Sequence, residues 1–102
     1  DPAKASDPPG APTGMDEAIN GRQALITWTD VDPNKMFGMC LYLSNENGFT
    51  PAPGNLKAIA TPGDEQIVLN GLEPGTYYYR LRPFDFAGVM GTACAQQSFT
   101  IA

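Results

Sequence analysis

Residues 72–84 read Leu-Glu-Pro-Gly-Thr-Tyr-Tyr-Tyr-Arg-Leu-Arg-Pro-Phe, and from residue 77 onward two kinds of side chain alternate. One parity holds aromatic and aliphatic residues, and the other holds a tyrosine and two arginines (Tyr77, Tyr79, Leu81; Tyr78, Arg80, Arg82). A period of two residues is typical of a β-strand with one face in a core. We therefore expect a strand over residues 76–84 whose arginine face is in contact with solvent.

Further short strands are expected on both sides of this stretch, over residues 24–28, 37–44, 55–60, 66–69 and 96–101. Trp28 is expected to anchor the core. In the second range the inward residues are Met39, Leu41 and Leu43, and the outward residues are Cys40 and Tyr42. The inward face of residues 55–60 stays unassigned. Together the pattern predicts an all-β sandwich of about seven short antiparallel strands in two sheets, without helices.

Composition agrees with one small folded domain. The chain has 102 residues, of which 42% are hydrophobic, and 11 Gly and 10 Pro call for frequent turns. The net charge of −5 argues against nucleic acid as a partner, because nucleic acid attracts clustered Lys and Arg. No apolar run is about 18 residues long, so we expect no insertion into a membrane.

The first twelve residues have a different composition from the rest. They read Asp-Pro-Ala-Lys-Ala-Ser-Asp-Pro-Pro-Gly-Ala-Pro, and repeated proline favours extended polyproline conformations. We interpret residues 1–12 as a semi-rigid linker to a neighbouring domain and residues 13–102 as the sandwich. A terminus without a role is the alternative.

The stretch Leu72 to Tyr78, taken with Trp28, resembles the fibronectin type III family. The resemblance covers about residues 11–102 and includes the Ala-Pro-Thr-Gly entry at residues 11–14. It implies an immunoglobulin-like sandwich in which Trp28, Leu72 and a corner tyrosine have structural roles. Counting forward from Leu72 gives Tyr78 as the corner tyrosine, and counting back from residues 80–82 gives Tyr77. We favour Tyr77, which shares its parity with Leu81, and expect its hydroxyl to bond to nearby backbone.

Catalytic chemistry finds little support in the residues present. The chain has no His, which removes the usual general base and the commonest metal ligand. The acidic pairs at residues 16–17 and 64–65 are sequence neighbours, whose side chains diverge. Asp30, Asp32 and Asn34 are spaced like the opening of a calcium loop but lack its following Gly and distal Glu. We expect no enzyme activity, no cofactor and no metal.

The strand order of the family also bears on the two cysteines. It places a strand between Cys40 and the region of Cys94, a separation of about 9.6 Å. A disulfide requires Cα atoms within about 7 Å. We therefore expect two free thiols, with a disulfide as the alternative if Cys94 lies in a mobile loop.

One surface has the composition of a contact patch. Tyr42, Tyr78, Arg80 and Arg82 are expected to gather on the outer face of one sheet, and Tyr and Arg are enriched at interfaces. Stacking of Tyr on Arg that only stabilises the sheet is the alternative. Phe49 and Phe86 are expected in loops, either as anchors packed on the body or as exposed rings that stack on sugar or seat a neighbouring domain.

The function expected from this sequence is structural. The Pro-rich N-terminal segment and residues 84–88 are similar to the corresponding parts of modules in phage tail-tip and tail-fibre proteins. They are also similar to modules of secreted bacterial polysaccharide-degrading enzymes. The first resemblance implies a spacer or contact domain in the virion, with neighbouring domains or subunits, or a host-surface glycan or protein, as partners. The second implies an extracellular accessory module that spaces a catalytic domain or weakly holds polysaccharide. A cell-adhesion domain is a third class, although no Arg-Gly-Asp run is present.

Overall fold

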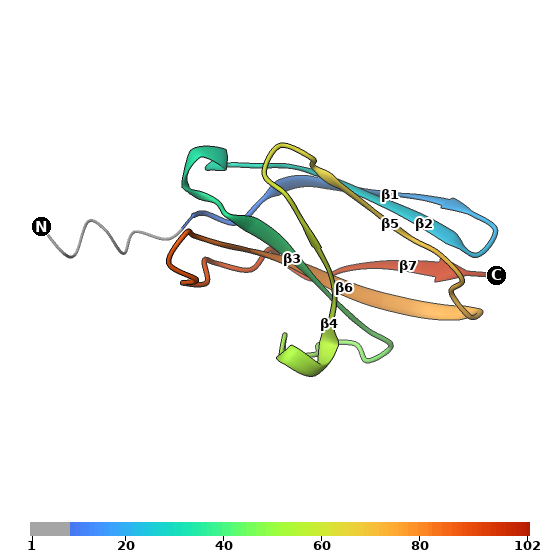
Figure 1. Ribbon diagram of the computed structural model, residues 1–102. Helices are drawn as coiled ribbons and strands as arrows, with labels where there is room; N and C mark the ends of the chain where they lie inside the picture. Colours follow the sequence, from blue (N-terminus) through green and yellow to red (C-terminus); the bar gives the residue numbers. More distant parts are fainter. Residues whose placement is uncertain (1–8) are drawn as a thin grey trace, which may run out of the picture.

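The computed structural model describes residues 9–102, which form a sandwich of two antiparallel sheets (Figure 1). The three-stranded sheet has the order β1-β2-β5, and the four-stranded sheet has the order β4-β3-β6-β7. The strands are β1 (Thr13–Asn20), β2 (Gln23–Thr29), β3 (Gly38–Ser44), β4 (Leu56–Ala60), β5 (Gln66–Leu69), β6 (Gly75–Phe84) and β7 (Gln97–Ile101). The predicted fold class is confirmed, with two short 3-10 helices, η1 (Pro33–Lys35) and η2 (Pro53–Asn55), in the loops.

Every strand range expected from the sequence is present, with bounds that shift by no more than one residue at either end. β1 is the strand that the sequence did not delimit. Most of its residues are exposed, because it lies at the edge of its sheet. Its Glu17 carboxylate accepts a hydrogen bond of 2.6 Å from the hydroxyl of Tyr79. Because Glu17 bonds to a core tyrosine, an acidic side chain stands where an apolar one would be expected, and the alternation of apolar and polar side chains is lost in β1.

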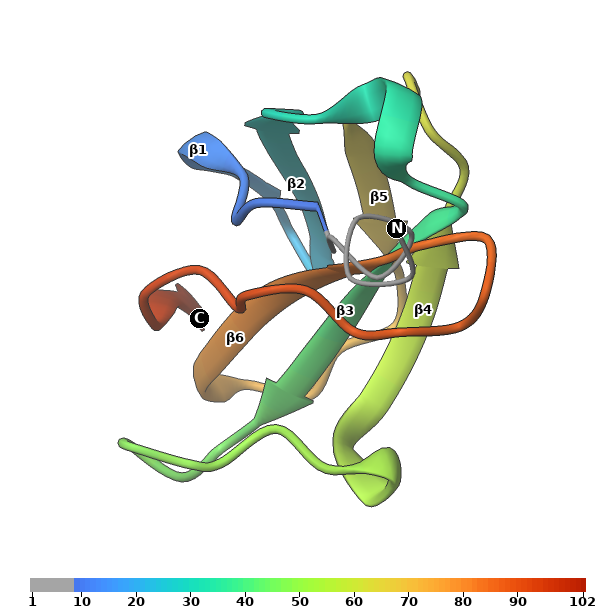
Figure 2. The same ribbon diagram turned by 90° about the vertical axis from the view of Figure 1, so that its left-hand side faces the viewer.

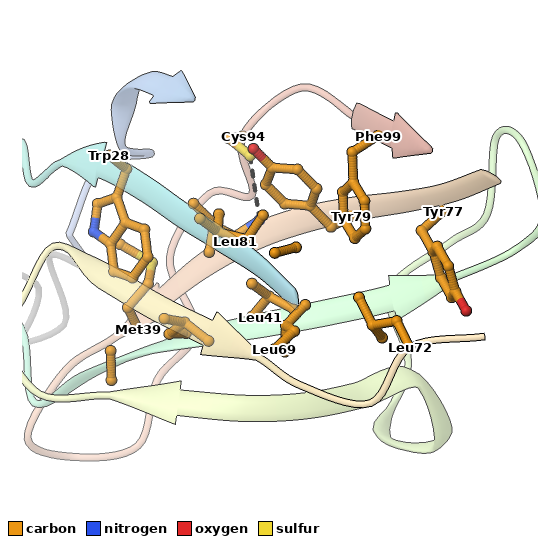
Figure 3. Packing of buried hydrophobic residues seen from close by; sticks show 14 of the residues in the cluster. Trp28, Met39, Leu41, Leu69, Leu72, Tyr77, Tyr79, Leu81, Cys94 and Phe99 are labelled. Carbon is orange, nitrogen blue, oxygen red and sulfur yellow. Dashed lines mark hydrogen bonds between the residues drawn. The ribbon is translucent and has the colours of Figure 1, made fainter. Parts of the chain in front are cut away.

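The main core lies between the two sheets (Figure 3). Tyr79, Leu81, Leu41 and Ile26 are fully buried there. Ala58 and Ala60 give β4 its inward face, which the sequence left unassigned. Burial of these side chains is the main stabilising contribution to the fold.

Trp28 and Tyr77 occupy fixed positions at the two ends of this core (Figure 3). The Trp28 indole is 4% exposed, and its Nε1 donates to Asp30 Oδ1 at 2.8 Å. The Tyr77 hydroxyl donates to the Glu73 carbonyl oxygen at 2.6 Å, and its ring stacks on Phe99 with centroids 5.3 Å apart. Leu72 is buried nearby, and Tyr78 lies on the opposite face of β6. Tyr77 therefore has the backbone bond expected of the corner tyrosine.

The packed body begins before the predicted boundary at residue 13. Residues 1–8 of the predicted linker lie outside the described residues. Pro9 and Pro12 are buried, and Ala11 packs against the main core. Four residues assigned to the linker therefore belong to the folded domain.

Candidate functional site

The predicted contact patch lies on the outer face of the four-stranded sheet. Tyr42 pairs with Arg80 and Cys40 pairs with Arg82 in the register of β3 and β6, so these side chains share a face. Tyr42 and Cys40 are nevertheless 8% and 5% exposed, because Phe49 from the loop after β3 covers them. Both side chains lie on the outer face of the sheet, as expected, but they are buried there and not in contact with solvent. They form an outer cluster with Phe49, bordered by Tyr78, Phe84 and Met90.

Both arginines of this patch bind the loop that returns from β6 to β7. Arg80 Nε donates to the Cys94 carbonyl oxygen at 2.9 Å, and Arg82 Nε donates to the Gly91 carbonyl oxygen at 2.7 Å. The same loop bonds to the β6 backbone, because the Gly91 N–H donates to Pro83 and the Cys94 N–H donates to Leu81. The arginines therefore hold this loop against the sheet. The alternation of side chains along β6 indicates the face on which the arginines lie, but not their binding to the loop.

The two cysteines are free, and they lie on opposite sides of this sheet. Cys40 belongs to the outer cluster, whereas Cys94 belongs to the main core. Cys94 Sγ accepts a hydrogen bond from the Leu81 N–H at 3.2 Å, as Figure 3 shows. Burial raises the pKa of both thiols, and the Leu81 bond offsets part of this effect at Cys94. Neutral, buried thiols make poor nucleophiles.

An exposed apolar surface lies at the end of the sandwich where the chain enters. The loops after β2, β4 and β6 meet there (Figure 2). Phe86 is 72% exposed and Phe37 is 58% exposed, and their ring centroids are 5.6 Å apart in an edge-to-face arrangement. Phe37 was expected to begin a strand, but β3 starts at Gly38 and leaves its ring outside the core.

A pocket of about 520 Å³ opens between these loops, a volume typical of ligand sites. Its walls are mostly apolar, with two polar side chains among them (Pro33, Met36, Phe37, Pro62, Phe86; Asn34, Thr61). We refer to it as the Phe37–Phe86 pocket. Phe86 was expected to be an aromatic ring in a loop, but no sequence pattern indicated that Phe37 would lie beside it. The two rings are brought together by loops that are far apart in the chain.

The Phe86 ring is carried by a turn with its own hydrogen bonds. The carboxylate of Asp85, a residue that is 7% exposed, accepts bonds from the Ala87 and Val89 N–H groups at 2.9 and 2.8 Å. The Gly88 N–H donates to the Asp85 carbonyl oxygen at 3.0 Å, and Gly88 has a φ of 82°, which favours glycine. The exposed ring is therefore presented by an ordered turn.

The acidic residues that are spaced like a calcium loop accept hydrogen bonds from N–H groups of the domain itself. Asp30 Oδ1 accepts from the Trp28 indole and Oδ2 from the Gly63 N–H at 3.1 Å. Asp32 Oδ2 accepts from the Gly10 N–H at 2.8 Å. Within residues 9–102, no group of three or more His, Cys, Asp or Glu side chains is arranged to hold a metal ion.

Two contacts define a clamp on the entering chain, made of Pro9, Gly10, Asp32 and Gly91. The Gly10 N–H is bound by Asp32 on one side. On the other side Gly91 lies against Pro9, so closely that a Cβ at Gly91 would overlap the Pro9 carbonyl oxygen. The Pro9 side chain is fully buried. The direction in which the chain enters the domain is therefore set by residues of the loops after β2 and β6.

The chain has the fold of a fibronectin type III domain. It is similar to the FN1–FN3 fragment of chicken contactin (CNTN1), with a TM-score of 0.75 and 14% identity over 91% of this chain and 32% of that one. An Fn3-like protein from Clostridium thermocellum gives a TM-score of 0.72 and 19% identity over 88% of this chain and 90% of that one. A β-1,2-glucanase from Parabacteroides distasonis gives a TM-score of 0.74 and 19% identity over 90% of this chain and 12% of that one.

At these sequence identities the likeness shows a shared fold only. The chain also matches the spore cortex lytic enzyme SleM of Clostridium perfringens, and it spans 28% of that protein, 32% of the contactin fragment and 12% of the glucanase. No protein-family model and no curated protein matches the sequence. Among residues 9–102, no helix has the length and apolarity needed to cross a membrane.

Proposed function

We propose that this chain is a non-catalytic spacer and contact module of a larger protein. The observation that carries the proposal is the clamp on Pro9 and Gly10, because contacts that hold the residues before β1 set the direction in which a preceding segment leaves the domain. The clamp lies beside the end of β6, at Pro83, and β7 ends at Ile101, opposite Gly75 at the start of β6. Gly75 and Pro83 are eight positions apart along β6, a distance of about 26 Å.

A module of this kind acts through geometry. Entry at one end and exit near the other hold the flanking parts of a polypeptide at a set distance and direction. The exposed Phe37 and Phe86 rings give the entry end an apolar surface on which a neighbour can pack. The predicted patch contributes less to such contacts, since Tyr42 is buried and both arginines bind the domain's own loop.

For the parent protein we propose a phage tail-tip or tail-fibre protein, which places the module in the virion. The support is the resemblance of the Pro-rich lead and residues 84–88 to such modules. Its partners are then neighbouring domains or subunits of the tail, or a glycan or protein of the host surface.

The second candidate is an accessory module of a secreted bacterial polysaccharide-degrading enzyme. The observation that favours it is the exposed aromatic pair at the pocket, because such rings stack on the apolar faces of sugars. The same fold also occurs as a small part of a β-1,2-glucanase. In this role Asn34 and Thr61 are the pocket side chains that can bond to sugar hydroxyls.

Size-exclusion chromatography with light scattering, run beside a glycan array, separates these candidates. A self-associated species without glycan binding supports assembly in a tail, and a monomer without glycan binding supports the spacer role. A monomer that binds polysaccharide, and loses this binding in Phe86→Ala, contradicts the first proposal in favour of the second. Val68→Ala is the matched control, since Val68 is 45% exposed on a strand of the other sheet.

A further inference from the structure

We propose that the free edge of β7 pairs antiparallel with β7 of a second copy of this chain, which joins the two four-stranded sheets into one continuous sheet. This inference goes beyond the proposed spacer function, which needs no second copy. It names a contact that holds one such module directly beside another.

The first argument is the open side of β7. This strand lies at the end of its sheet and pairs with β6 through five consecutive residues without a register shift. Neighbouring residues of an antiparallel strand alternate between bonding to the partner strand and pointing their N–H and C=O groups away from it. Within residues 9–102, no other strand or loop is bonded to the backbone of β7 on that outer side. A regular strand with an open side is a template for a further strand.

The second argument is the contrast with the other three edge strands, each of which hinders such pairing. β1 carries Asp16 and Glu17 and has a register shift, and β4 carries Lys57 and also has a register shift. β5 has only four residues. Charges, irregularities and short length protect sheet edges from added strands. β7 reads Gln-Ser-Phe-Thr-Ile, without charge or proline, so among residues 9–102 it is the edge that lacks these protections.

The third argument is an apolar side chain beside this edge. Figure 2 shows β1 and the C-terminal end of the chain on the same side of the molecule, and β1 contacts β7. Ile19 of β1 lies opposite the fully buried Ala24 and therefore on the inward face of its sheet. It is nevertheless 42% exposed, since the opposite sheet ends at β7. A strand added beside β7 would extend that sheet and reduce the exposure of Ile19.

The distribution of charge favours a second copy as the added strand. The chain has a net charge of −5, so two copies repel each other over most of their surface. Residues 86–102, which include β7, contain no Asp, Glu, Lys or Arg. Two copies can therefore approach at this edge without bringing like charges together. Pairing of the same strand about a two-fold axis is self-complementary, and the exposed Ser98 and Thr100 of one copy would lie beside those of the other.

The test is sedimentation equilibrium of the full chain from micromolar to millimolar concentration, which should show a monomer–dimer equilibrium. The double variant Ser98→Lys/Thr100→Lys should lose the dimer, because like charges on facing strands repel. The matched control is Gln66→Lys/Val68→Lys, which places the same charges at exposed positions of the β5 edge. Both variants make the chain less acidic by the same amount, and the control should keep the dissociation constant of the wild-type chain.

Amide hydrogen exchange of the wild-type chain gives a second readout that needs no variant. Alternate amides of β7 should exchange more slowly as the concentration rises through the range in which the dimer forms. The amides of the edge strands β1 and β4 should exchange at the same rate at every concentration.

Four results overturn the inference. They are a monomer at every concentration, a dimer that persists in the β7 double variant, an equal loss of the dimer in both double variants, and protection that rises at another edge instead of β7. None of these results affects the amide order of Gly10 and Ala11, which is measured separately. Failure of this inference and failure of the spacer function are therefore distinguishable.

Discussion

The Gly10 N–H donates to Asp32 Oδ2 at 2.8 Å, which joins the chain before β1 to the loop after β2. Twenty-two residues separate the two partners. The bond closes one side of the clamp, and the contact of Gly91 with Pro9 closes the other. The loops of the entry end thus have a structural task in addition to presenting Phe37 and Phe86.

Replacing Asp32 by alanine should loosen this clamp. A partly buried hydrogen bond to a charged acceptor contributes about 1.5 kcal/mol, so Asp32→Ala should lower the free energy of unfolding by about that amount in urea denaturation. The control is Asp64→Ala, whose carboxylate accepts a bond from the exposed Thr61 hydroxyl and whose effect should stay within about 0.5 kcal/mol. Equal losses in both variants would contradict a specific role for Asp32.

Gly91 should not tolerate a side chain. A Cβ there would overlap the Pro9 carbonyl oxygen and lie 3.2 Å from the Pro83 ring, so Gly91→Ala must displace backbone. We expect a loss of about 2 kcal/mol in the free energy of unfolding. Gly54→Ala is the control, because no atom lies within 4 Å of its Cβ position, and an unchanged urea midpoint in both variants would show that Pro9 is not held.

Tyr77 and Tyr78 should differ although they are adjacent. Tyr77→Phe removes the bond to the Glu73 carbonyl oxygen and keeps the stacking on Phe99, for an expected loss of about 1 kcal/mol. Tyr78→Phe changes a partly exposed residue on the other face and should cost less. The reverse order in thermal or urea unfolding would assign the corner to Tyr78.

Stability should fall in alkaline solution. Burial raises the pKa of the Cys40 and Cys94 thiols above the ordinary value of 9.0, and burial together with the Glu17 carboxylate raises the pKa of Tyr79 above 10.0. Above about pH 9 the unfolded chain loses these protons while the folded chain keeps them, so the free energy of unfolding decreases as pH rises.

Urea midpoints between about pH 7 and pH 10 measure this effect. They should be flat up to about pH 8.5 and then decline. In Cys94→Ala the decline should be shallower, even though the variant is less stable at every pH because of the cavity it creates. A midpoint that rises with pH above 9 would be incompatible with buried neutral thiols.

The strands could be predicted because each places one face in the core. Ile67 and Leu69 in β5, and Tyr79 and Leu81 in β6, are buried at alternate positions as their spacing indicated. β1 could not be delimited in this way. It is an edge strand, and its Glu17 carboxylate bonds to the buried Tyr79, which disrupts the apolar alternation.

The candidate site could be predicted only in part. The alternation of side chains along β3 predicts the side of the sheet on which Tyr42 lies. It does not predict that Phe49, from the following loop, covers Tyr42. Phe86 was expected in a loop, whereas Phe37 and the clamp depend on contacts between distant loops. No local pattern encodes the approach of Gly91 to Pro9, because it arises from the course of the backbone.

The central claim, that the domain fixes the direction of its entering chain, is tested most directly by ¹⁵N relaxation of the Gly10 and Ala11 amides. If the direction is fixed, both amides should have order parameters near 0.85, equal to those of β2 and β6, with a marked decrease in Asp32→Ala. Values below about 0.6 in the wild-type chain would contradict it, since the chain would then enter the domain without a fixed direction.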